Sequence, residues 1–218
     1  MSLPCLVIGN CNYSSWSLRP FMALRHAGIP FELKKLWLDT PEFHPQVAAL
    51  GGGRTVPLLV LPQQTLWESL AICEYAADVN PALWPADLLV RAQARSLACE
   101  MHAGFTALRS ELPMNIRARR RVSLSAAAQA DLVRLFTLWQ SCREAHGSAG
   151  PWLFGSYSVA DAMFMPVASR LATYGIDCPP VAAAYRDTLL GDPHFADWQA
   201  MALAETQVVA MDEAGEPV

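Results

Sequence analysis

The sequence predicts an α/β domain followed by an all-helical domain, and three observations support this prediction. Residues 1–80 alternate between short apolar runs and helical patterns in the order β-α-β-α-β-β-α. A segment rich in proline, residues 80–85, then interrupts the chain. Beyond it the apolar residues follow helical spacing, and no strand pattern is convincing. The predicted domains therefore span residues 1–80 and 86–218.

In the N-terminal part, residues 3–8 form an apolar run that predicts a buried strand. Ser17 is placed to cap a helix, which tolerates Pro20 in its first turn and ends at Gly28. A second strand is predicted over residues 31–38, followed by a short helix or irregular segment over residues 41–50. A hairpin of residues 58–61 and 65–67 comes next, and a helix over residues 68–79 ends this part.

The second part has helical spacing throughout, with proline or a capping residue near the predicted ends. The segment Gly155–Asp161 contains a capping box, in which Ser158 caps a helix and Asp161 caps back. The predicted helices cover residues 87–112, 125–146, 159–174 and 181–190, and a fifth opens at 192–193.

Composition restricts the function. With 53% hydrophobic and 17% charged residues, the chain of 218 residues supports a sizeable core. A net charge of −4 gives no reason to expect nucleic acid as a partner, and no apolar run is long enough to cross a membrane. The basic run Arg117–Arg121 fits a solvated loop or helix end, with a partner or anion patch as the alternative.

Six cysteines are scattered, without a C-x-x-C pair or a Cys/His metal spacing. We therefore expect no metal site and a reduced chain. Met1–Pro4 shows no signal-peptide pattern, which adds to the expectation of a cytoplasmic protein.

The segment Thr55–Ser69 points to a ligand. Pro57 stands at the start of a strand, and an X-Pro bond is where a cis peptide costs little. With a cis bond, the backbone of Val56 turns outward and can pair with an extended peptide. Glu68 and Ser69 lie at a helix start, where backbone N–H groups favour an anion. Together they predict a receptor for a small peptide that carries a carboxylate and an amine.

These motifs, in this order, resemble the soluble glutathione transferase family over nearly the whole chain. The element order matches its thioredoxin-like domain followed by helices, Val56-Pro57 matches its cis-proline signature, and Glu68-Ser69 matches its acid–serine pair. The capping box ending at Asp161 is a third, independent match. The resemblance implies glutathione as co-substrate and a homodimer.

The loop Ser14–Arg19 resembles the serine signature of the zeta class, which includes maleylacetoacetate isomerases. In that class a cysteine follows the two serines, and here Trp16 takes its place. No tyrosine is positioned like the catalytic one of the mammalian cytosolic classes, because Tyr13 comes too late in the loop.

The resemblance also implies site residues. Val56 would offer backbone groups to the cysteinyl unit, Glu68 would pair with the γ-glutamyl ammonium, and Ser69 with its carboxylate. Arg54 would meet the glycine carboxylate, unless it is a solvated loop arginine. Ser14 is the predicted hydroxyl that activates the thiol, and Ser15 is the alternative.

Thiol activation requires lowering a pKa of ~8.5 by about two units. A serine hydroxyl and the N-terminus of the first helix would share this task. A plainer interpretation makes Ser14, Ser15 and Ser17 loop and cap residues only.

The electrophile is expected between the domains. Besides Asn12, the predicted pocket residues are Cys11, Trp16, Met101, His102 and Phe105. Met101 and Phe105 also fit a helix-packing core, and His102 fits a hydrogen-bonded structural histidine.

Three functions follow from the sequence. The first is conjugation of glutathione to small apolar electrophiles. The second is glutathione-dependent cis–trans isomerisation of a maleyl-type substrate. The third is a binding module on the same fold without turnover.

Overall fold

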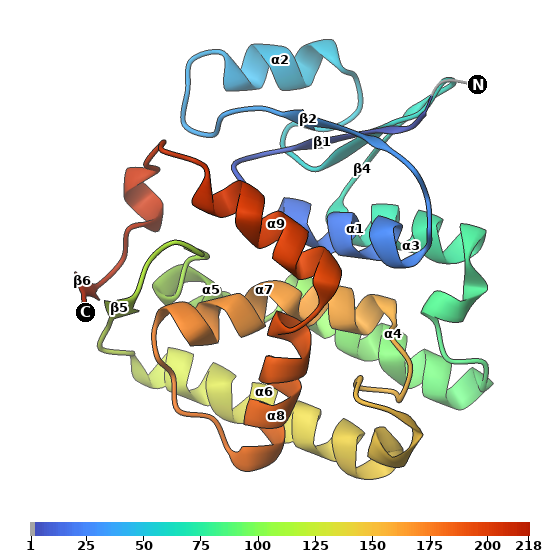
Figure 1. Ribbon diagram of the computed structural model, residues 1–218, viewed down its shortest axis with the longest axis vertical. Helices are drawn as coiled ribbons and strands as arrows, with labels where there is room; N and C mark the ends of the chain where they lie inside the picture. Colours follow the sequence, from blue (N-terminus) through green and yellow to red (C-terminus); the bar gives the residue numbers. More distant parts are fainter. Residues whose placement is uncertain (1–2) are drawn as a thin grey trace.

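The computed structural model describes residues 3–218, so residues 1 and 2 of the predicted N-terminal domain lie outside the described residues. A mixed sheet flanked by helices occupies one end of the molecule, and helices make up the rest (Figure 1). The predicted fold class, a thioredoxin-like part followed by a helical part, is confirmed. The division at residues 80–86 stays a prediction.

The sheet has four strands in the order β2-β1-β3-β4. Strand β1 pairs parallel with β2 on one side and antiparallel with β3 on the other, and β3 and β4 form the predicted hairpin. The strands are β1 (Cys5–Ile8), β2 (Glu32–Lys35), β3 (Leu58–Val60) and β4 (Thr65–Trp67).

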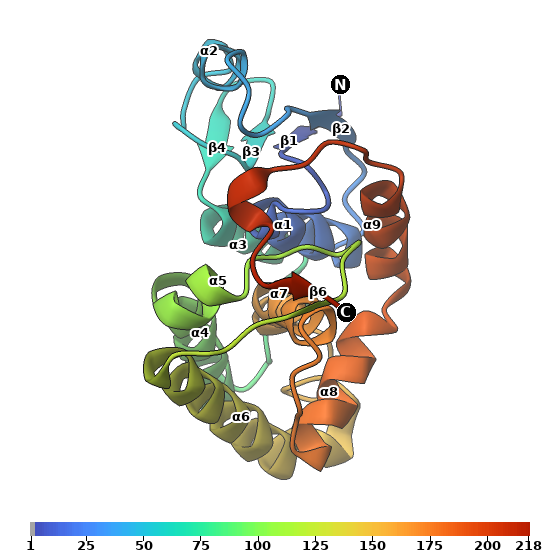
Figure 2. The ribbon, with the colours of Figure 1, turned by 90° about the vertical axis from the view of Figure 1, so that its left-hand side faces the viewer.

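Both faces of the sheet are covered because side chains alternate along each strand. Leu6 and Ile8 of β1 belong to the core shared with α1 (Ser15–His26) and α3 (Ser69–Val79). Val7, between them in sequence, packs in a smaller cluster with α2 (Phe43–Ala49) on the opposite face. Figure 2 shows α2 above the sheet and α1 and α3 below it.

The helical part is built around α7, whose residues are almost all buried. This helix packs against α1, α4 and α8, so it joins the two parts of the chain. The helices here are α4 (Leu88–Ala103), α5 (Thr106–Glu111), α6 (Ala126–His146), α7 (Val159–Thr173), α8 (Pro180–Leu190) and α9 (Pro193–Leu203), with short 3-10 turns η1 (Pro81–Leu83), η2 (Gly147–Ala149) and η3 (Ala210–Asp212).

Three expectations about elements are wrong. The helix predicted over residues 87–112 breaks into α4 and α5 at Gly104, where an added Cβ would lie 2.8 Å from the Glu100 carbonyl oxygen, and at Phe105, whose φ is +52°. Ser17 does not cap α1, which begins at Ser15 with Ser14 at its N-cap position; the Ser17 hydroxyl instead contacts Gly9 and Ser14. The second part also holds a short strand pair, β5 (Arg120–Arg121) with β6 (Glu216–Pro217).

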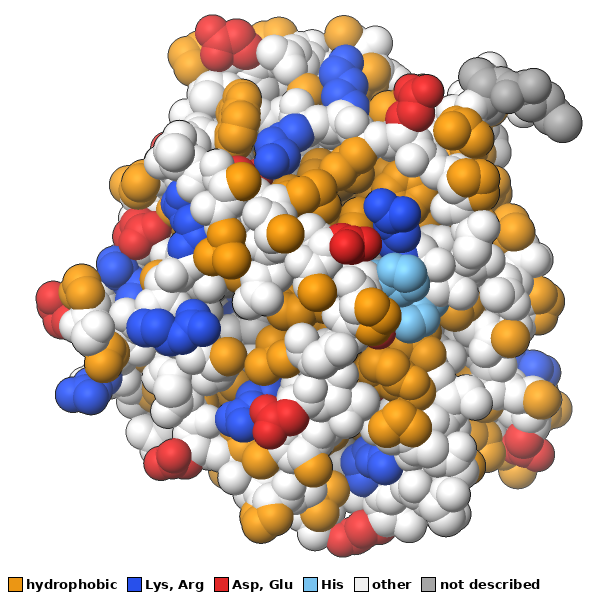
Figure 3. All heavy atoms as spheres, viewed as in Figure 1, with side chains coloured by type: hydrophobic (Ala, Val, Ile, Leu, Met, Phe, Trp, Pro, Cys, Tyr) orange, Lys and Arg blue, Asp and Glu red, His pale blue; other side chains and the backbone are white. Residues whose placement is uncertain are grey.

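No helix among residues 3–218 is both long and apolar enough to cross a membrane. Charges of both signs are interspersed on the face shown in Figure 3. The basic run at 117–121 is largely engaged within the protein, since Arg117 and Arg120 bond to carbonyl groups of the C-terminal segment.

The capping box at the start of α7 is confirmed. The fully buried Asp161 carboxylate accepts hydrogen bonds from the Ser158 N–H at 2.8 Å and the Ser158 hydroxyl at 2.9 Å. It also accepts from the Leu153 N–H at 3.1 Å and the Tyr185 hydroxyl at 2.8 Å. One carboxylate thus satisfies four buried donors from three segments.

Asp161→Asn should lower the free energy of unfolding by about 2–4 kcal/mol, because the amide replaces an acceptor oxygen by a donor that faces other donors. Denaturant unfolding measures this loss. The exposed Asp197→Asn on α9 is the matched control and should change stability by less than about 0.5 kcal/mol. Equal effects of the two substitutions would contradict the role assigned to Asp161.

Candidate active site

Two adjoining pockets lie where the sheet and the start of α1 face the helical part. The larger has a volume of about 470 Å³ and the smaller about 290 Å³. Trp16, Thr55 and Val56 line both. A ligand that fills the smaller pocket therefore reaches the larger one past Trp16.

The smaller pocket brings together the five residues that the sequence predicts to bind glutathione. Arg54, Val56, Pro57, Glu68 and Ser69 all line it. The Val56–Pro57 peptide bond is cis. The Ser69 hydroxyl, in a residue only 1% exposed, has no hydrogen-bond partner among residues 3–218. A buried hydroxyl of this kind costs free energy unless a ligand binds it.

Glu68 has an unusual backbone conformation, with φ +67°, which a non-glycine residue rarely adopts. Its exposed carboxylate lies 3.9 Å from His102 Nε2. Burial is the main cause that holds the pKa of His102 below its ordinary value. The nearby Arg19 adds to this effect, and Glu68 opposes it, so His102 is neutral at pH 7. The contact is therefore no ion pair at that pH, and Glu68 keeps its charge available for a cation.

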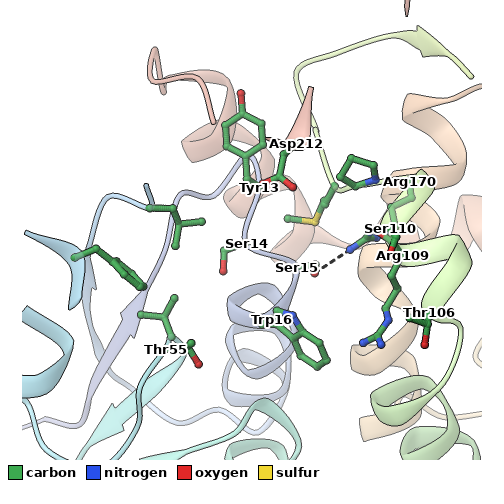
Figure 4. A pocket seen from close by; sticks show the side chains of 15 residues that line it. Tyr13, Ser14, Ser15, Trp16, Thr55, Thr106, Arg109, Ser110, Arg170 and Asp212 are labelled. Carbon is green, nitrogen blue, oxygen red and sulfur yellow. Dashed lines mark hydrogen bonds between the residues drawn. The ribbon is translucent and has the colours of Figure 1, made fainter. Parts of the chain in front are cut away.

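Ser14 and Ser15 line the larger pocket at the start of α1 (Figure 4). The Ser14 and Ser17 hydroxyl oxygens are 2.7 Å apart. Ser15 Oγ accepts a hydrogen bond from Arg170 Nη2 at 3.0 Å, which is the dashed line in Figure 4. The two hydroxyls thus have different partners, one within α1 and the other on α7.

Arginines gather around this pocket without carboxylates bound to them. Arg170 is buried and donates to the carbonyls of Arg109 and Leu112. The Arg109 guanidinium lies 5.2 Å from the Trp16 ring centroid, and Arg19, 1% exposed, lies 4.2 Å from it. Nε and Nη1 of Arg19 have no partner among the described residues.

Burial, with repulsion between these arginines, lowers the pKa of Arg19 to about 9 and that of Arg170 to about 10. Both guanidinium groups remain charged at pH 7. Asp212 is the acid that lines the pocket, and burial raises its pKa to about 6 although Arg170 opposes the rise. The larger pocket is therefore suited to an anionic ligand.

The structure corrects most of the predicted electrophile pocket. Cys11, Met101 and Phe105 lie in the hydrophobic core and do not line either pocket, because their helix or loop turns them inward. Asn12 is fully buried and donates to Asn115. The rings of His102 and Trp16 form a T-shaped pair with centroids 5.4 Å apart. Of the residues predicted for the electrophile pocket, Trp16 alone lines the larger pocket.

Cys11 is buried for a specific reason. Its N–H donates to Glu205 Oε1 at 2.7 Å, and its carbonyl accepts from Trp198 Nε1 at 2.8 Å. Burial raises the pKa of the Cys11 thiol to about 12, so it carries no thiolate at neutral pH.

The C-terminal segment after α9 holds the loop that leads to Ser14. Glu205 accepts from the backbone of Cys11 and also of Asn12, and Lys35 pairs with it at 2.5 Å. The Asn10 side chain donates to Gln207 at 2.6 Å, and the Tyr13 hydroxyl donates to Glu213 at 2.6 Å. Figure 2 shows this segment crossing in front of α1.

Sequence reasoning missed the arginines and this C-terminal segment. Arg170 is the one basic residue in the apolar helix α7, and that isolation is the signal that could have marked it. Arg109 and Asp212 stand in ordinary polar surroundings and give no such signal. The pocket residues that the sequence did not indicate are Tyr13, Leu38, Phe43, Thr55, Thr106, Arg109, Ser110, Pro113, Met114, Arg170 and Asp212.

Among residues 3–218, no cluster of three or more His, Cys, Asp or Glu side chains is arranged to hold a metal ion. The chemistry of the two pockets is instead that of hydroxyls, guanidiniums and two carboxylates, Glu68 and Asp212.

Known proteins resemble this chain in both sequence and structure. Residues 13–79 match the family model of the glutathione S-transferase N-terminal domain. A probable maleylacetoacetate isomerase of Caenorhabditis elegans is 25% identical over 187 residues, which cover 83% of this chain and 86% of that protein.

Two solved structures illustrate the likeness. A glutathione transferase homologue from Burkholderia GL BGR1, with bound glutathione, has a TM-score of 0.70 and 25% identity over 92% of this chain and 98% of its own. A bacterial maleyl pyruvate isomerase of the zeta class has a TM-score of 0.72 and 22% identity, covering 93% of this chain and 100% of its own. The N-terminal part of the chain thus matches the glutathione S-transferase family model, and the chain as a whole is similar to glutathione transferases and to the isomerases related to them.

Asp212 makes anion binding in the larger pocket depend on pH. Below about pH 6 its carboxyl group is neutral, so repulsion of a dianion disappears while the arginines stay charged. The affinity for fumarate, a dianion throughout this range, should rise about 3- to 10-fold as the pH falls from about 7.5 to about 5.5. Isothermal titration calorimetry measures this change.

Asp212→Asn should bind fumarate more tightly at pH 7.5 and lose most of the dependence on pH. If the fumarate affinity of this variant still depends on pH as in the wild type, another group titrates. His102 would then be the next residue to substitute.

Proposed function

We propose that this protein is a glutathione-dependent enzyme that acts on a carboxylate-bearing electrophile, with cis–trans isomerisation of a maleyl-type substrate as its reaction. The observation that supports the choice of substrate is the pair Arg109 and Arg170 in the larger pocket, where neither guanidinium is bound to a carboxylate. An apolar electrophile, the first expectation from the sequence, would give these guanidinium groups no carboxylate to bind.

Glutathione would occupy the smaller pocket. The free Ser69 hydroxyl at the N-terminus of α3 suits the γ-glutamyl carboxylate, and the Glu68 carboxylate suits its ammonium. The Val56 backbone would pair with the cysteinyl unit, and the exposed Arg54, which lines the same pocket, would meet the glycine carboxylate. The sulfur would then lie toward Trp16 and the serines.

Thiolate stabilisation would come from several weak sources that add up. The Ser14 hydroxyl would donate to sulfur, the N-terminus of α1 would favour the negative charge, and the arginines contribute a positive field. Lowering the thiol pKa by two units requires about 2.7 kcal/mol of preferential stabilisation. Ser15 is second choice as donor because Arg170 holds it toward the helical part.

In the proposed reaction the thiolate sulfur forms a bond to one carbon of the cis double bond. The π electrons move onto the conjugated carbonyl as an enolate, and the remaining C–C single bond rotates. The enolate then re-forms the double bond in the trans geometry and expels the thiolate. Arg109 and Arg170 would hold the substrate carboxylates and the enolate charge during this sequence.

Conjugation is the second candidate, supported by the same thiolate site. It requires only that the adduct be protonated and released before the thiolate leaves again. The two reactions differ in the fate of glutathione, which conjugation consumes and isomerisation regenerates.

Incubation with maleylacetoacetate and a limiting amount of glutathione tests the proposal. We expect the trans product in many-fold excess over glutathione, with free thiol unchanged at the end of the reaction. Stoichiometric loss of thiol would instead establish conjugation, and binding of glutathione without either product would leave a binding module.

The variant Arg109→Gln separates substrate binding from glutathione binding. Loss of one charge-assisted contact should raise KM for the maleyl substrate about 10-fold or more, while the affinity for glutathione changes less than about 2-fold. A variant that keeps the wild-type KM would remove Arg109 from the substrate site.

A homodimer is part of this proposal. Exposed apolar side chains lie on β4 and at the start of α4, where Trp67 is 50%, Leu88 68% and Leu89 78% exposed. A second copy of the chain would cover them, and twofold contact is the commonest soluble assembly. Light scattering after size exclusion should give twice the chain mass of 23.8 kDa, and Leu89→Glu should lower it.

A further inference from the structure

The direction of one hydrogen bond at the start of α1 follows from its surroundings. The Ser14 and Ser17 oxygens are 2.7 Å apart, and either hydroxyl could donate on distance alone. Ser17 is fully buried, with no exposed surface. A hydroxyl proton in such a place needs an acceptor, because an unpaired buried donor costs free energy.

The Ser17 hydroxyl has two neighbours among the described residues. The Gly9 N–H donates to Ser17 Oγ at 3.2 Å, and this group can only be a donor. Ser14 Oγ is therefore the remaining acceptor for the Ser17 proton. If Ser14 donated instead, Ser17 Oγ would accept twice and its own proton would have no partner.

We infer that Ser17 is a positioning residue, which donates its proton to Ser14 Oγ and leaves the Ser14 proton free to point at a bound sulfur. Ser14 lines the pocket, and Figure 4 shows its hydroxyl facing the space toward Thr55. This inference rests on the proposed function, since it assigns a task to the Ser14 proton in thiol activation.

The hydrogen bonds that link the Gly9 N–H, Ser17 and Ser14 all point in the same direction. Each hydroxyl accepts on one side and donates on the other, which polarises the next donor and strengthens it. Gly9 follows β1 directly, so the end of the sheet fixes Ser17, and Ser17 fixes the rotamer of Ser14. A sulfur anion would receive the last proton of the chain.

The thiol pKa of bound glutathione tests this assignment, followed by ultraviolet thiolate absorbance against pH. The variants are Ser17→Ala, which removes the hydroxyl, and Ser17→Thr, which keeps it. Ser96→Ala is the matched control, because Ser96 is an exposed helix serine on α4 bonded to the Ala92 carbonyl. Affinity for S-methylglutathione, which has no thiol, reports whether the pocket survives each substitution.

We expect Ser17→Ala to raise the bound thiol pKa by about one unit, which is about a 10-fold loss of thiolate well below that pKa. S-methylglutathione should bind within about 2-fold of wild type, and Ser17→Thr should restore most of the lowered pKa. A merely structural role would weaken binding of S-methylglutathione and leave the thiol pKa of the bound fraction unchanged.

A wild-type thiol pKa in Ser17→Ala would overturn the inference and leave the proposed function intact. Equal shifts in Ser17→Ala and Ser17→Thr would also overturn it, because the volume of the side chain and not its hydroxyl would then matter. If wild type itself binds glutathione without lowering the thiol pKa, the proposed function fails, and the Ser17 result is not needed to show it.

Discussion

The Glu205 carboxylate is the contact on which the candidate site most depends. Glu205 is 5% exposed, its carboxylate accepts hydrogen bonds from the backbone N–H groups of Cys11 and Asn12, and it pairs with Lys35, the last residue of β2. These two N–H groups belong to the loop between β1 and α1. Fixing them sets where α1 begins, and with it the position of the Ser14 hydroxyl. An element from the end of the chain thereby determines geometry near its beginning.

The second constraint is an imbalance of charge. Arg19 and Arg170 are buried, and neither binds a carboxylate in the described part of the chain. Burial of such charges is costly, and the Trp16 ring, backbone carbonyls and Ser15 offset it only in part. An anionic thiolate and a substrate carboxylate would complete the balance, so the free protein holds its arginines ready for negatively charged ligands.

The contrast between the two pockets explains how much of the site could be predicted. Apart from Trp16, the smaller pocket is built from two short segments, residues 53–57 just before β3 and residues 67–69 between the end of β4 and the start of α3. Local patterns such as a strand-starting proline or a helix-starting acid reveal sites of this kind. The capping box at Asp161 was predictable for the same reason, since both partners lie within one turn.

The larger pocket draws on α1, α5, α7 and the C-terminal segment, so its residues are brought together only by packing. Helical spacing made Met101 and Phe105 look available, but Met101 lies on the core-facing side of α4, and Phe105 is buried in the core directly after the break at Gly104. Arg109 reaches the pocket because α5 starts in a new direction after that break. No local pattern indicates such a change of direction, which depends on contacts far along the chain.

Trp16 lies at the boundary between the smaller and the larger pocket. It stands where the zeta signature has a cysteine, and of the residues predicted for the electrophile pocket it is the one that lines both pockets. A cysteine would leave Arg19 without its aromatic neighbour and would open the boundary between the pockets. The larger ring instead supports two guanidinium groups and narrows that boundary. In the proposed reaction, substrate selection would therefore depend on the tryptophan and on the arginines stacked around it, as well as on the serines beside it.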